Sequence, residues 1–365
     1  MRNPKTDQMV SMASFMALMM LLSVLFAGRA QAENGVLPDL TELPAMVVND
    51  AHHSVQLGVA RAGDRLVSVG EQGIVLLSDD HGETWSQSAG VPVSVTLTQV
   101  EFVSDTRGWA IGHSGVVLRT DTAGDEWTRV LTGSEILELI KAEVATVPEA
   151  SPGAQALKRN ASYLNGSEPL LDIHITKEGE GWILGAYGIA LRTSDYGETW
   201  ESGFASINNP NSSHVYQLVP SPGSGSLMVG ERGFVVSAAA ETDTYEPVAI
   251  DYQGTFFGGV ALSEDDYLLF GLRGNVWRSS GEGWESVNTG TESSFNAAIP
   301  TPLGIVLGDV SGRLFLYSEQ DGTIREFAET SDAAVTDLIL NSRGELVMTT
   351  GRGLKLLGLD NTAFK

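Results

Sequence analysis

A short pattern returns seven times along the 365-residue chain, at intervals of roughly forty residues. Each copy has an apolar run, a glycine, two or three residues, a second glycine and another apolar run. The clearest copies are Val67–Leu76, Trp109–Leu118 and Trp182–Leu191, and weaker copies centre on Gly230/Gly233, Gly271/Gly274, Gly308/Gly312 and Thr350/Gly353. Apolar runs separated by glycine turns indicate β-strands. This period predicts an all-β fold, a seven-bladed β-propeller, which is more often a binding platform than an enzyme.

Each repeat is expected to form a four-stranded blade. In repeat two the strands are expected at 96–104, 109–111, 116–120 and 127–130. Repeat seven has only three expected strands, the last at 354–357, before the chain ends. Because an open sheet edge needs a partner, we expect an N-terminal strand at 43–48 to pair with 354–357 and close the last blade.

One interval between repeats is longer than the others. Gly115 and Gly188 are 73 residues apart, yet no further glycine pair lies between them. This spacing predicts an insertion at about 131–169 between blades two and three. A helix capped by Ser134 is expected to run to about Ala145. The insertion could form a lid near the channel mouth or a packed element without function, and the sequence leaves both open.

A second motif lies in the turn before the fourth strand of some blades, where the sequence follows Ser/Thr-x-Asp-x-Gly-x-Thr-Trp. Asp and Ser or Thr side chains can bond the amides of such a turn, and glycine can adopt its left-handed position. The tryptophan rings are expected to be buried between blades. The two full copies consist of Ser78, Asp80, Gly82, Thr84 and Trp85, and of Thr193, Asp195, Gly197, Thr199 and Trp200.

These Asp-box turns, joined to the Gly-Trp-Ala-Ile-Gly-x-x-Gly segment at 108–115, resemble the photosystem II assembly and stability factor family. The resemblance covers most of residues 50–357 and is strongest over repeats one to three. It implies a seven-bladed propeller with BNR-type turns that acts as an assembly or accessory factor for a membrane protein complex. In a non-photosynthetic bacterium that complex could be an envelope transporter, and the sequence does not say whether the host is photosynthetic.

The first 32 residues have the features of a signal peptide, with a weakly basic start, an apolar stretch and a small-x-small site at Ala30-Gln31-Ala32. A retained membrane anchor is the alternative. Cleavage after Ala32 would give a periplasmic protein, 33–365, folded as a single propeller. It would need no disulfide, because the chain has no cysteine, and would not insert directly into the membrane.

The chain is strongly acidic, with a formal net charge of −24. Removal of the leader would take away three basic residues and one acidic residue, which makes the charge −26. Such a protein is repelled by nucleic acid and by anionic lipid head groups. The charge could reflect the habitat or the partner.

Signatures of catalysis are missing from the sequence. There is no Gly-x-Ser-x-Gly nucleophile motif, no phosphate-binding loop and no metal-type spacing of histidines. His174 is expected to line the channel. A sialidase-like glycoside hydrolase is the alternative class, because sialidases are propellers with Asp boxes. However, no arginine motif precedes the first Asp box. We therefore predict no catalytic residue, no metal and no cofactor.

The turns between strands two and three carry a recurring basic position. Alternate turns of a meander lie at alternate ends of the sheet, so these turns are expected opposite the Asp boxes. The residue before the second glycine is Gln72, Ser114, Tyr187, Arg232, Arg273, Ser311 and Arg352 in blades one to seven. We predict a binding face with Arg232, Arg273, Arg352 and Tyr187, on the side that carries the insertion. Salt bridges to Glu231 and Asp309 are the alternative.

The sequence thus predicts an exported, monomeric, non-catalytic propeller that binds a protein partner, either a membrane complex or its subunits. It does not identify this partner.

Overall fold

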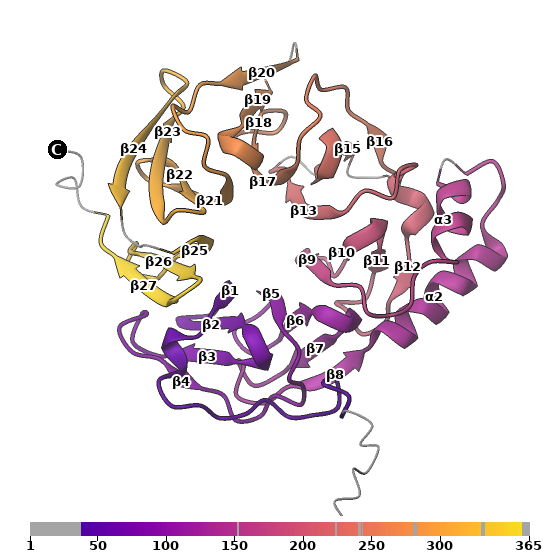
Figure 1. The fold of residues 1–365 in the computed structure, drawn as a ribbon, viewed down its shortest axis with the longest axis horizontal. Coiled ribbons are helices and arrows are strands. Elements are labelled where there is room, and N and C mark those ends of the chain that lie inside the picture. Colours follow the sequence, from indigo (N-terminus) through magenta and orange to yellow (C-terminus); the bar gives the residue numbers. More distant parts are fainter. Residues whose placement is uncertain are drawn as a thin grey trace, which may run out of the picture. The chain divides into compact units, whose positions relative to one another are not determined.

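Seven antiparallel sheets surround a common centre in the computed structural model (Figure 1), counted over the residues it describes. These residues are 38–151, 153–222, 225–239, 242, 244–279, 283–329 and 333–359. The predicted signal peptide lies outside them. From Leu40 onward the described residues form one compact unit, and each repeat predicted from the sequence corresponds to one sheet. The predicted seven-bladed propeller is therefore confirmed.

The strands follow the chain from the centre of the propeller outward in each blade. Blades one and two are β1 Gln56–Ala62, β2 Arg65–Gly70, β3 Val75–Ser78 and β4 Ser86–Gln87, then β5 Leu97–Phe102, β6 Gly108–Gly112, β7 Val117–Thr120 and β8 Thr128–Leu131. Blades three and four are β9 Leu170–Ile175, β10 Gly181–Gly185, β11 Ala190–Thr193 and β12 Glu201–Ser202, then β13 Val215–Pro220, β14 Ser226–Gly230, β15 Val235–Ala238 and β16 Glu246–Pro247. Blades five and six are β17 Phe256–Ala261, β18 Tyr267–Gly271, β19 Val276–Ser279 and β20 Trp284–Val287, then β21 Phe295–Thr301, β22 Gly304–Asp309, β23 Arg313–Ser318 and β24 Thr323–Glu329. Blade seven is β25 Val335–Leu340, β26 Leu346–Thr350 and β27 Gly353–Leu357.

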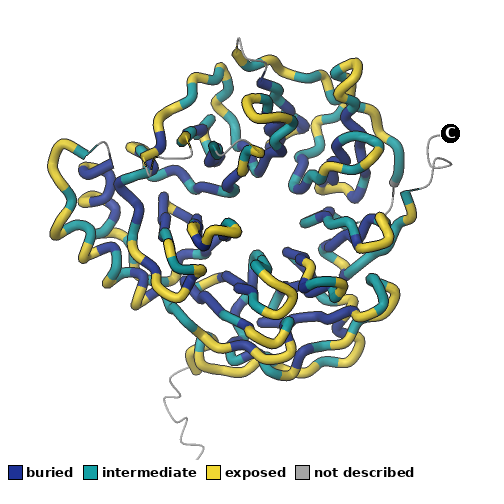
Figure 2. The backbone as a smooth tube through the Cα atoms, turned by 180° about the vertical axis from the view of Figure 1, so that it is seen from behind, coloured by how far each residue is buried: buried dark blue, intermediate teal, exposed yellow. Residues whose placement is uncertain are grey.

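The core lies between neighbouring blades. One cluster, for example, joins the fully buried Trp109 and Ile111 of blade two to Ile183 and Leu191 of blade three. The second strands are mainly apolar because adjacent blades cover both of their faces, and β6 is buried along its whole length. Figure 2 shows the same distribution, with buried segments within the blades and exposed ones at the loops.

The predicted closure by residues 43–48 is wrong. In the described part of the chain the sheet of blade seven has three strands, and no strand pairs with the outer edge of β27. Residues 43–48 instead lie along blade one, because their backbone groups bond to its outer segment. Ala45 N donates to Val91 O at 3.0 Å, and Val48 N donates to the Gln87 side chain at 3.0 Å.

Direct contacts between blades seven and one close the ring. The Val59 amide donates to the Asp337 carboxylate at 3.0 Å, and the Thr336 hydroxyl donates to Gln56 O at 2.6 Å. Arg343 pairs with Glu83 across the same boundary at 2.7 Å. The ring is therefore joined by side chains that reach from one blade to the backbone or side chains of the next.

The insertion between blades two and three folds as α2 Gly133–Thr146 and α3 Ala154–Asn160. The N-cap of α2 is Thr132 rather than Ser134, because the Glu135 carboxylate accepts a hydrogen bond from the Thr132 amide at 2.8 Å. The sequence did not predict α3. Gly153 is the N-cap of this second helix.

The Asp boxes form the local network that their sequence predicts. The Asp80 carboxylate accepts hydrogen bonds from the Thr84 amide at 2.8 Å and the Thr84 hydroxyl at 2.6 Å, and these bonds lower the pKa of Asp80 to about 2. The Ser78 hydroxyl accepts from the Gly82 amide at 2.8 Å. In the second box Asp195, Thr199, Thr193 and Gly197 repeat these contacts.

The two Asp-box tryptophans differ in burial. Trp200 is 8% exposed and lies in the core shared by blades two and three. Trp85 is only half-buried, and its indole N–H donates to Gly82 O at 3.1 Å. The prediction of a fully buried ring is therefore wrong for Trp85, because it lies at the outer rim beside the three-stranded blade.

Candidate binding face

The turns between the second and third strands share one backbone form in blades one to five. Each is a short 3-10 turn, and these are η2 Glu71–Gly73, η3 His113–Gly115, η4 Ala186–Gly188, η6 Glu231–Gly233 and η7 Leu272–Gly274. The middle residue of each has φ between 55° and 59°, and the glycine after it is also left-handed. Residues other than glycine rarely adopt this conformation.

This backbone displays the middle side chain to solvent. The Arg232 side chain is 61% exposed and Tyr187 is 52% exposed. Arg273 and Arg352 are exposed as well. The turn of blade seven differs, because the Thr350 hydroxyl accepts from the Arg352 amide at 3.0 Å and donates to Gly353 O at 2.8 Å. Tyr187, Arg232 and Arg273 thus occupy the same type of turn, and Arg352 lies at the corresponding position of a different turn, at the same ends of the strands.

The Asp boxes occupy the opposite ends of the strands. Gly82 lies beside Leu66 at the start of β2, and Tyr196 of the second box lies beside Gly179 in the turn between β9 and β10. The insertion contacts the other ends. The Gly115 amide donates to Glu168 O at 3.0 Å, and Asn160 donates to Tyr187 O at 2.8 Å. The insertion therefore lies beside η3 and η4, which are the turns of blades two and three that correspond to the arginine-bearing turns.

Salt bridging accounts for part of the arginine pattern. Arg232 pairs with its neighbour Glu231 at 3.1 Å, as the alternative reading proposed, but most of its side chain remains exposed. Among the ion pairs of the described residues, none joins Asp309 to Arg232, Arg273 or Arg352. The partner of Asp309 is Arg313, at 2.7 Å.

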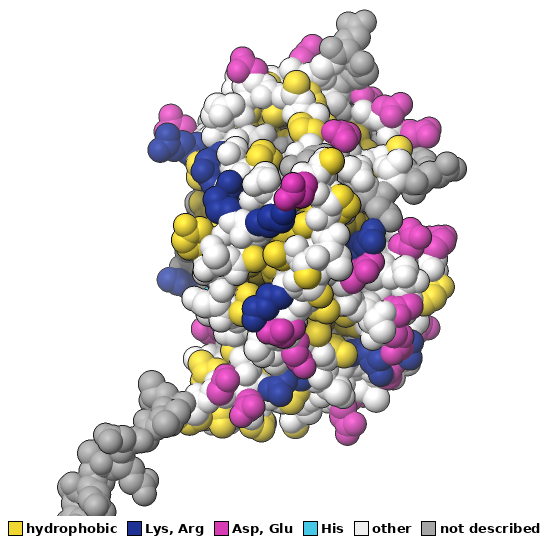
Figure 3. Space-filling view, turned by 90° about the vertical axis from the view of Figure 1, so that its right-hand side faces the viewer, with side chains coloured by type: hydrophobic (Ala, Val, Ile, Leu, Met, Phe, Trp, Pro, Cys, Tyr) yellow, Lys and Arg dark blue, Asp and Glu magenta, His cyan; other side chains and the backbone are white. Residues whose placement is uncertain are grey.

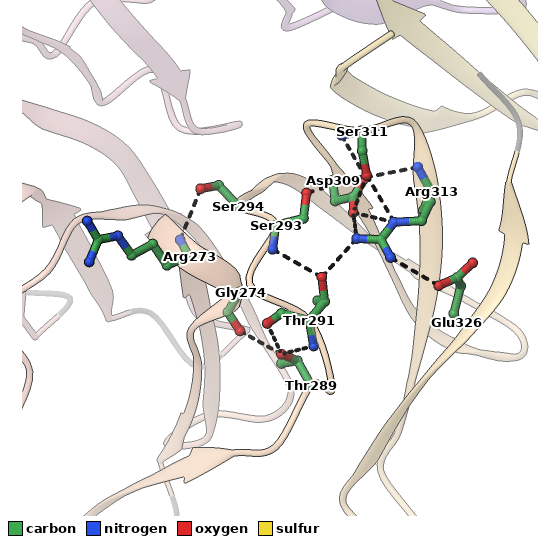
Figure 4. A network of polar contacts seen from close by, with 10 residues as sticks. All are labelled: Arg273, Gly274, Thr289, Thr291, Ser293, Ser294, Asp309, Ser311, Arg313 and Glu326. Carbon is green, nitrogen blue, oxygen red and sulfur yellow. Dashed lines mark hydrogen bonds and ion pairs between the residues drawn. The ribbon is translucent and has the colours of Figure 1, made fainter. Parts of the chain in front are cut away.

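Arg313 is a further arginine of this face that the sequence reasoning missed. Its guanidinium also donates to the Thr291 hydroxyl at 2.8 Å and pairs with Glu326 at 3.3 Å (Figure 4). Burial would raise the pKa of Asp309, but hydrogen bonds from Arg313 and Ser311 hold it below its usual range. Asp309 stands where blades one to five have the first glycine of the turn. This replacement of glycine by aspartate was the feature of the sequence that could have indicated the Asp309–Arg313 pair.

Aromatic rings form a row across blades three to five of the same face. Tyr187 packs edge-on against His214, with ring centroids 4.7 Å apart, and Tyr216 packs edge-on against Phe257 at 5.2 Å. His214 and Tyr216 are 6.4 Å apart and link the two pairs. The row leads from an exposed tyrosine to the centre of the propeller.

A central cavity of about 280 Å³ lies at the inner end of this row. Its lining includes Leu57, Thr98, Leu171, Tyr216, Phe257, Asn296 and Thr336, one from the inner strand of each blade. Among the described residues, none of its lining belongs to the insertion, so the insertion does not cover the cavity as a lid. Ile136 and Ile140 of α2 are instead buried in the core shared by blades two and three. The insertion is therefore a packed element of the fold.

The buried acids near the centre connect neighbouring blades. Asp172 accepts from the Leu218 amide at 2.7 Å, and burial raises its pKa to about 7. Burial likewise raises the pKa of Asp337 to about 6. Their oxygens are thus engaged with backbone amides, as a structural role requires.

His174 belongs to an ion pair between blades and not to the lining of the central cavity, which corrects its predicted place. Its Nδ1 lies 3.0 Å from the Glu101 carboxylate, whose other oxygen accepts from the Ile175 amide at 3.1 Å. Burial would lower the pKa of His174, but the bond to Glu101 raises it. No group of three potential metal ligands occurs in the described part of the chain.

Comparison with known families supports the resemblance drawn from the sequence. Residues 47–135 match the family described as photosynthesis system II assembly factor YCF48. The matched segment spans blade one, blade two and the start of the insertion. No curated protein matches the chain. The resemblance is thus confirmed by this match over the segment where the repeats are clearest.

Solved structures share the fold. A structure titled "YCF48 bound to D1 peptide" aligns with a TM-score of 0.63 at 16% identity, over 87% of this chain and 100% of that one. YCF48 from Cyanidioschyzon merolae aligns with a TM-score of 0.61 at 15% identity, over 86% and 97%. The WD40 propeller domain of Doa1 gives 0.63 at 11% identity, over 88% and 98%. Identities this low establish the fold alone.

The left-handed turns lead to a prediction about stability. Replacing Arg232 by glycine should give a protein about 0.5–1 kcal/mol more stable than replacing it by alanine, because alanine keeps the cost of the left-handed backbone. Both changes remove the same guanidinium. Urea unfolding of the two variants, and of the same pair at Arg273, measures the difference. Equal stability of the glycine and alanine variants would contradict the assignment of backbone strain.

Proposed function

We propose that this protein is an exported, non-catalytic propeller that binds a protein partner and serves as an assembly or accessory factor for a membrane protein complex. An envelope transporter is one such complex. The partner is recognised by the face that carries Tyr187, Arg232, Arg273 and Arg352. The mature form begins after Ala32 and acts in the periplasm as a monomer.

The main support for this proposal is that a strongly acidic chain has exposed arginines at the turns of one face. The net charge of −24 disfavours acidic ligands elsewhere, whereas exposed guanidinium groups in blades four, five and seven attract carboxylates. On the side shown in Figure 3, which carries the insertion, basic and acidic side chains are interspersed. In α2 Lys141 pairs with Glu138, and in blade three Arg192 pairs with Glu201. Arg232 pairs with Glu231 yet its side chain is 61% exposed, and Arg273 and Arg352 are exposed as well, so guanidinium groups are accessible at the turn tips of this face.

The match over 47–135 to a family of assembly factors supports the type of function, and one relative's structure is titled as bound to a peptide. Tyr187 and the rings of His214 and Tyr216 supply apolar area next to Arg232, because His214 also lies 3.8 Å from Glu231. Aromatic rings beside arginines are the composition of protein-binding hot spots. A peptide segment with acidic and apolar side chains fits this combination.

Changing Arg232, Arg273 and Arg352 together to glutamate should weaken partner binding at least about 100-fold, since three attractive contacts become repulsive. The measurement is affinity purification from envelope extract with wild-type and triple-variant protein. It is followed by titration of the recovered partner. Thermal stability should change by less than about 1 kcal/mol, as expected for exposed positions.

The matched control reverses three exposed basic residues away from the proposed face, namely Arg61 and Lys177 at the opposite ends of the strands and Arg325 on the outer strand of blade six. It makes the same change in net charge elsewhere on the protein. Partner binding that survives in the control and fails in the first variant supports the proposed face. Equal loss of partner binding in both variants would show that the effect comes from net charge and not from the proposed face. Normal binding by the first variant would overturn the proposal.

A further inference from the structure

A groove of about 540 Å³ lies between the end of the insertion and the turn η4 of blade three. Tyr163 and Leu164, which follow α3, line one side of it, and Tyr187 of η4 and Pro169 also belong to its lining. The groove is distinct from the central cavity, because the described linings of the two share no residue.

Two exposed tyrosines stand at this groove. Tyr163 is 77% exposed and Tyr187 is 52% exposed. The buried Asn160 connects their backbones, because its carbonyl accepts from the Tyr163 amide at 2.8 Å and its side chain donates to Tyr187 O at 2.8 Å. The two tyrosines are therefore held at a fixed backbone spacing while their rings are accessible. Exposed aromatic rings on an anchored backbone are typical of protein-binding surfaces.

The polar side chains of the groove are engaged within the loop that forms it. The Glu168 carboxylate accepts from the amides of Asn165 and Gly166, at 3.0 Å and 2.8 Å. The Asn165 side-chain oxygen accepts from the amide and the hydroxyl of Ser167, at 2.9 Å and 2.6 Å. These oxygens are thus used by the protein itself, whereas the phenol hydroxyls of the exposed tyrosines can donate to a ligand.

Proline matches this balance of donors and acceptors. It has no amide hydrogen, so it needs no acceptor when it is buried, and its carbonyl can accept from a tyrosine hydroxyl. Segments in the polyproline II form bind grooves lined by aromatic residues in this way. A sugar fits less well, because its many hydroxyl donors need acceptors and the Glu168 and Asn165 oxygens are already engaged.

Two arginines beside the groove favour a negative charge in the ligand. Arg159 directly precedes Asn160, and its guanidinium donates to Pro210 O. The Arg232 guanidinium donates to Asn211 O, the next residue of the same loop, at 3.5 Å. Both arginines are exposed, in a chain whose net charge is −24. They therefore favour a carboxylate next to the proline.

We propose that this groove binds a segment of the partner protein that combines proline with acidic residues. A proline ring lies against Tyr163 and Tyr187, and a neighbouring carboxylate pairs with Arg159 and Arg232. This inference rests on the proposed function, because it names the kind of partner sequence that the face binds. It also gives the end of the insertion a role in binding, as one wall of the site.

Fluorescence anisotropy with a synthetic peptide tests the assignment. The probe is a labelled peptide of repeated Pro-Pro-Glu triplets, which is titrated with the full chain. The control peptide has alanine in place of every proline and carries the same charge. We expect the proline peptide to bind at least about tenfold more tightly than the alanine peptide.

Tyr163→Ala and Tyr187→Ala should each weaken binding of the proline peptide at least about tenfold, because each removes one aromatic wall. The matched control is Tyr196→Ala. Tyr196 is 43% exposed and has a φ of 60°, close to the 56° of Tyr187, but it belongs to the second Asp box on the opposite side. This control should change the affinity by less than about twofold.

Three results would overturn the assignment. They are equal binding of the two peptides, no binding of the proline peptide at about 1 mM, and unchanged binding by Tyr163→Ala. Binding of a soluble glucose hexasaccharide in preference to the peptide would overturn it as well, since the groove would then be a sugar site.

Affinity purification from envelope extract separates this inference from the proposed function. A partner that Tyr163→Ala retains and the triple glutamate variant of Arg232, Arg273 and Arg352 loses would overturn the groove alone. A partner that Tyr163→Ala loses and the triple variant retains would support the tyrosine groove and overturn the arginine face. Loss of the partner in both variants would support both.

Discussion

Replacing Trp200 by alanine should lower the free energy of unfolding by about 3–5 kcal/mol, as for other large aromatic residues in protein cores. Trp200 is 8% exposed and packs with residues such as Ile183, Leu191 and Phe204. No described residue accepts a hydrogen bond from its indole N–H, so the loss is one of packing alone. Chemical denaturation followed by circular dichroism measures the effect.

The matched variant is Trp85→Ala, which removes the equivalent ring from blade one. That ring is half-buried, so we expect a smaller loss of about 1–2 kcal/mol. The comparison separates burial from motif, because the two Asp boxes share the motif and the hydrogen bonds of the turn, and differ at the indole N–H, which has an acceptor among the described residues only in Trp85. Equal losses at the two positions would show that the motif decides and that the difference in burial does not.

Replacing Asp172 by asparagine should stabilise the protein at pH 8 by about 3 kcal/mol more than at pH 5. Burial raises the pKa of Asp172 to about 7, so the folded state favours the neutral acid. A raised folded-state pKa contributes stability that is complete below pH 4 and is lost as the pH rises through about 7. Asparagine is neutral throughout, and its carbonyl can accept the Leu218 amide.

The readout is the change in unfolding free energy of the variant relative to the wild type, measured at pH 5 and pH 8. This difference cancels the titration of most other groups, although Glu101 and His174 lie close enough to Asp172 to couple with it. Burial raises the pKa of Asp337 to about 6, so Asp337→Asn should change the unfolding free energy with the same sign and by a smaller amount. A variant whose effect is the same at both pH values would show that the carboxylate stays ionised in the folded protein.

Local patterns allowed most of the fold to be predicted. A glycine pair between apolar runs defines one hairpin, and the Asp box defines the next turn, so each blade follows from about forty consecutive residues. The face of the turns follows from counting strands. The position of Arg232 and Arg273 opposite Gly82 and Gly197 needed no contact between blades to predict.

Features that depend on contacts between blades could not be predicted in this way. Residues 43–48 are apolar enough to form a strand, but Gln87 and Val91 hold them on blade one. The Glu101–His174 pair joins two blades whose inner strands are about seventy residues apart in sequence. Arg313 escaped notice because its partner Asp309 replaces a glycine of the repeat. In each case the partner is distant in sequence or breaks the repeat.

The five left-handed turns separate the chemistry of this face from its architecture. Gln72, Ser114, Tyr187, Arg232 and Arg273 have φ values within a few degrees of one another although their side chains differ in size and charge. The backbone therefore imposes the same cost whichever unbranched residue it displays. Substitutions at these five sites can therefore change what the surface binds without changing the packing of the blades. Equivalent turn positions of the propeller can thus carry different side chains on the same backbone, so that binding specificity can differ between relatives that share the fold.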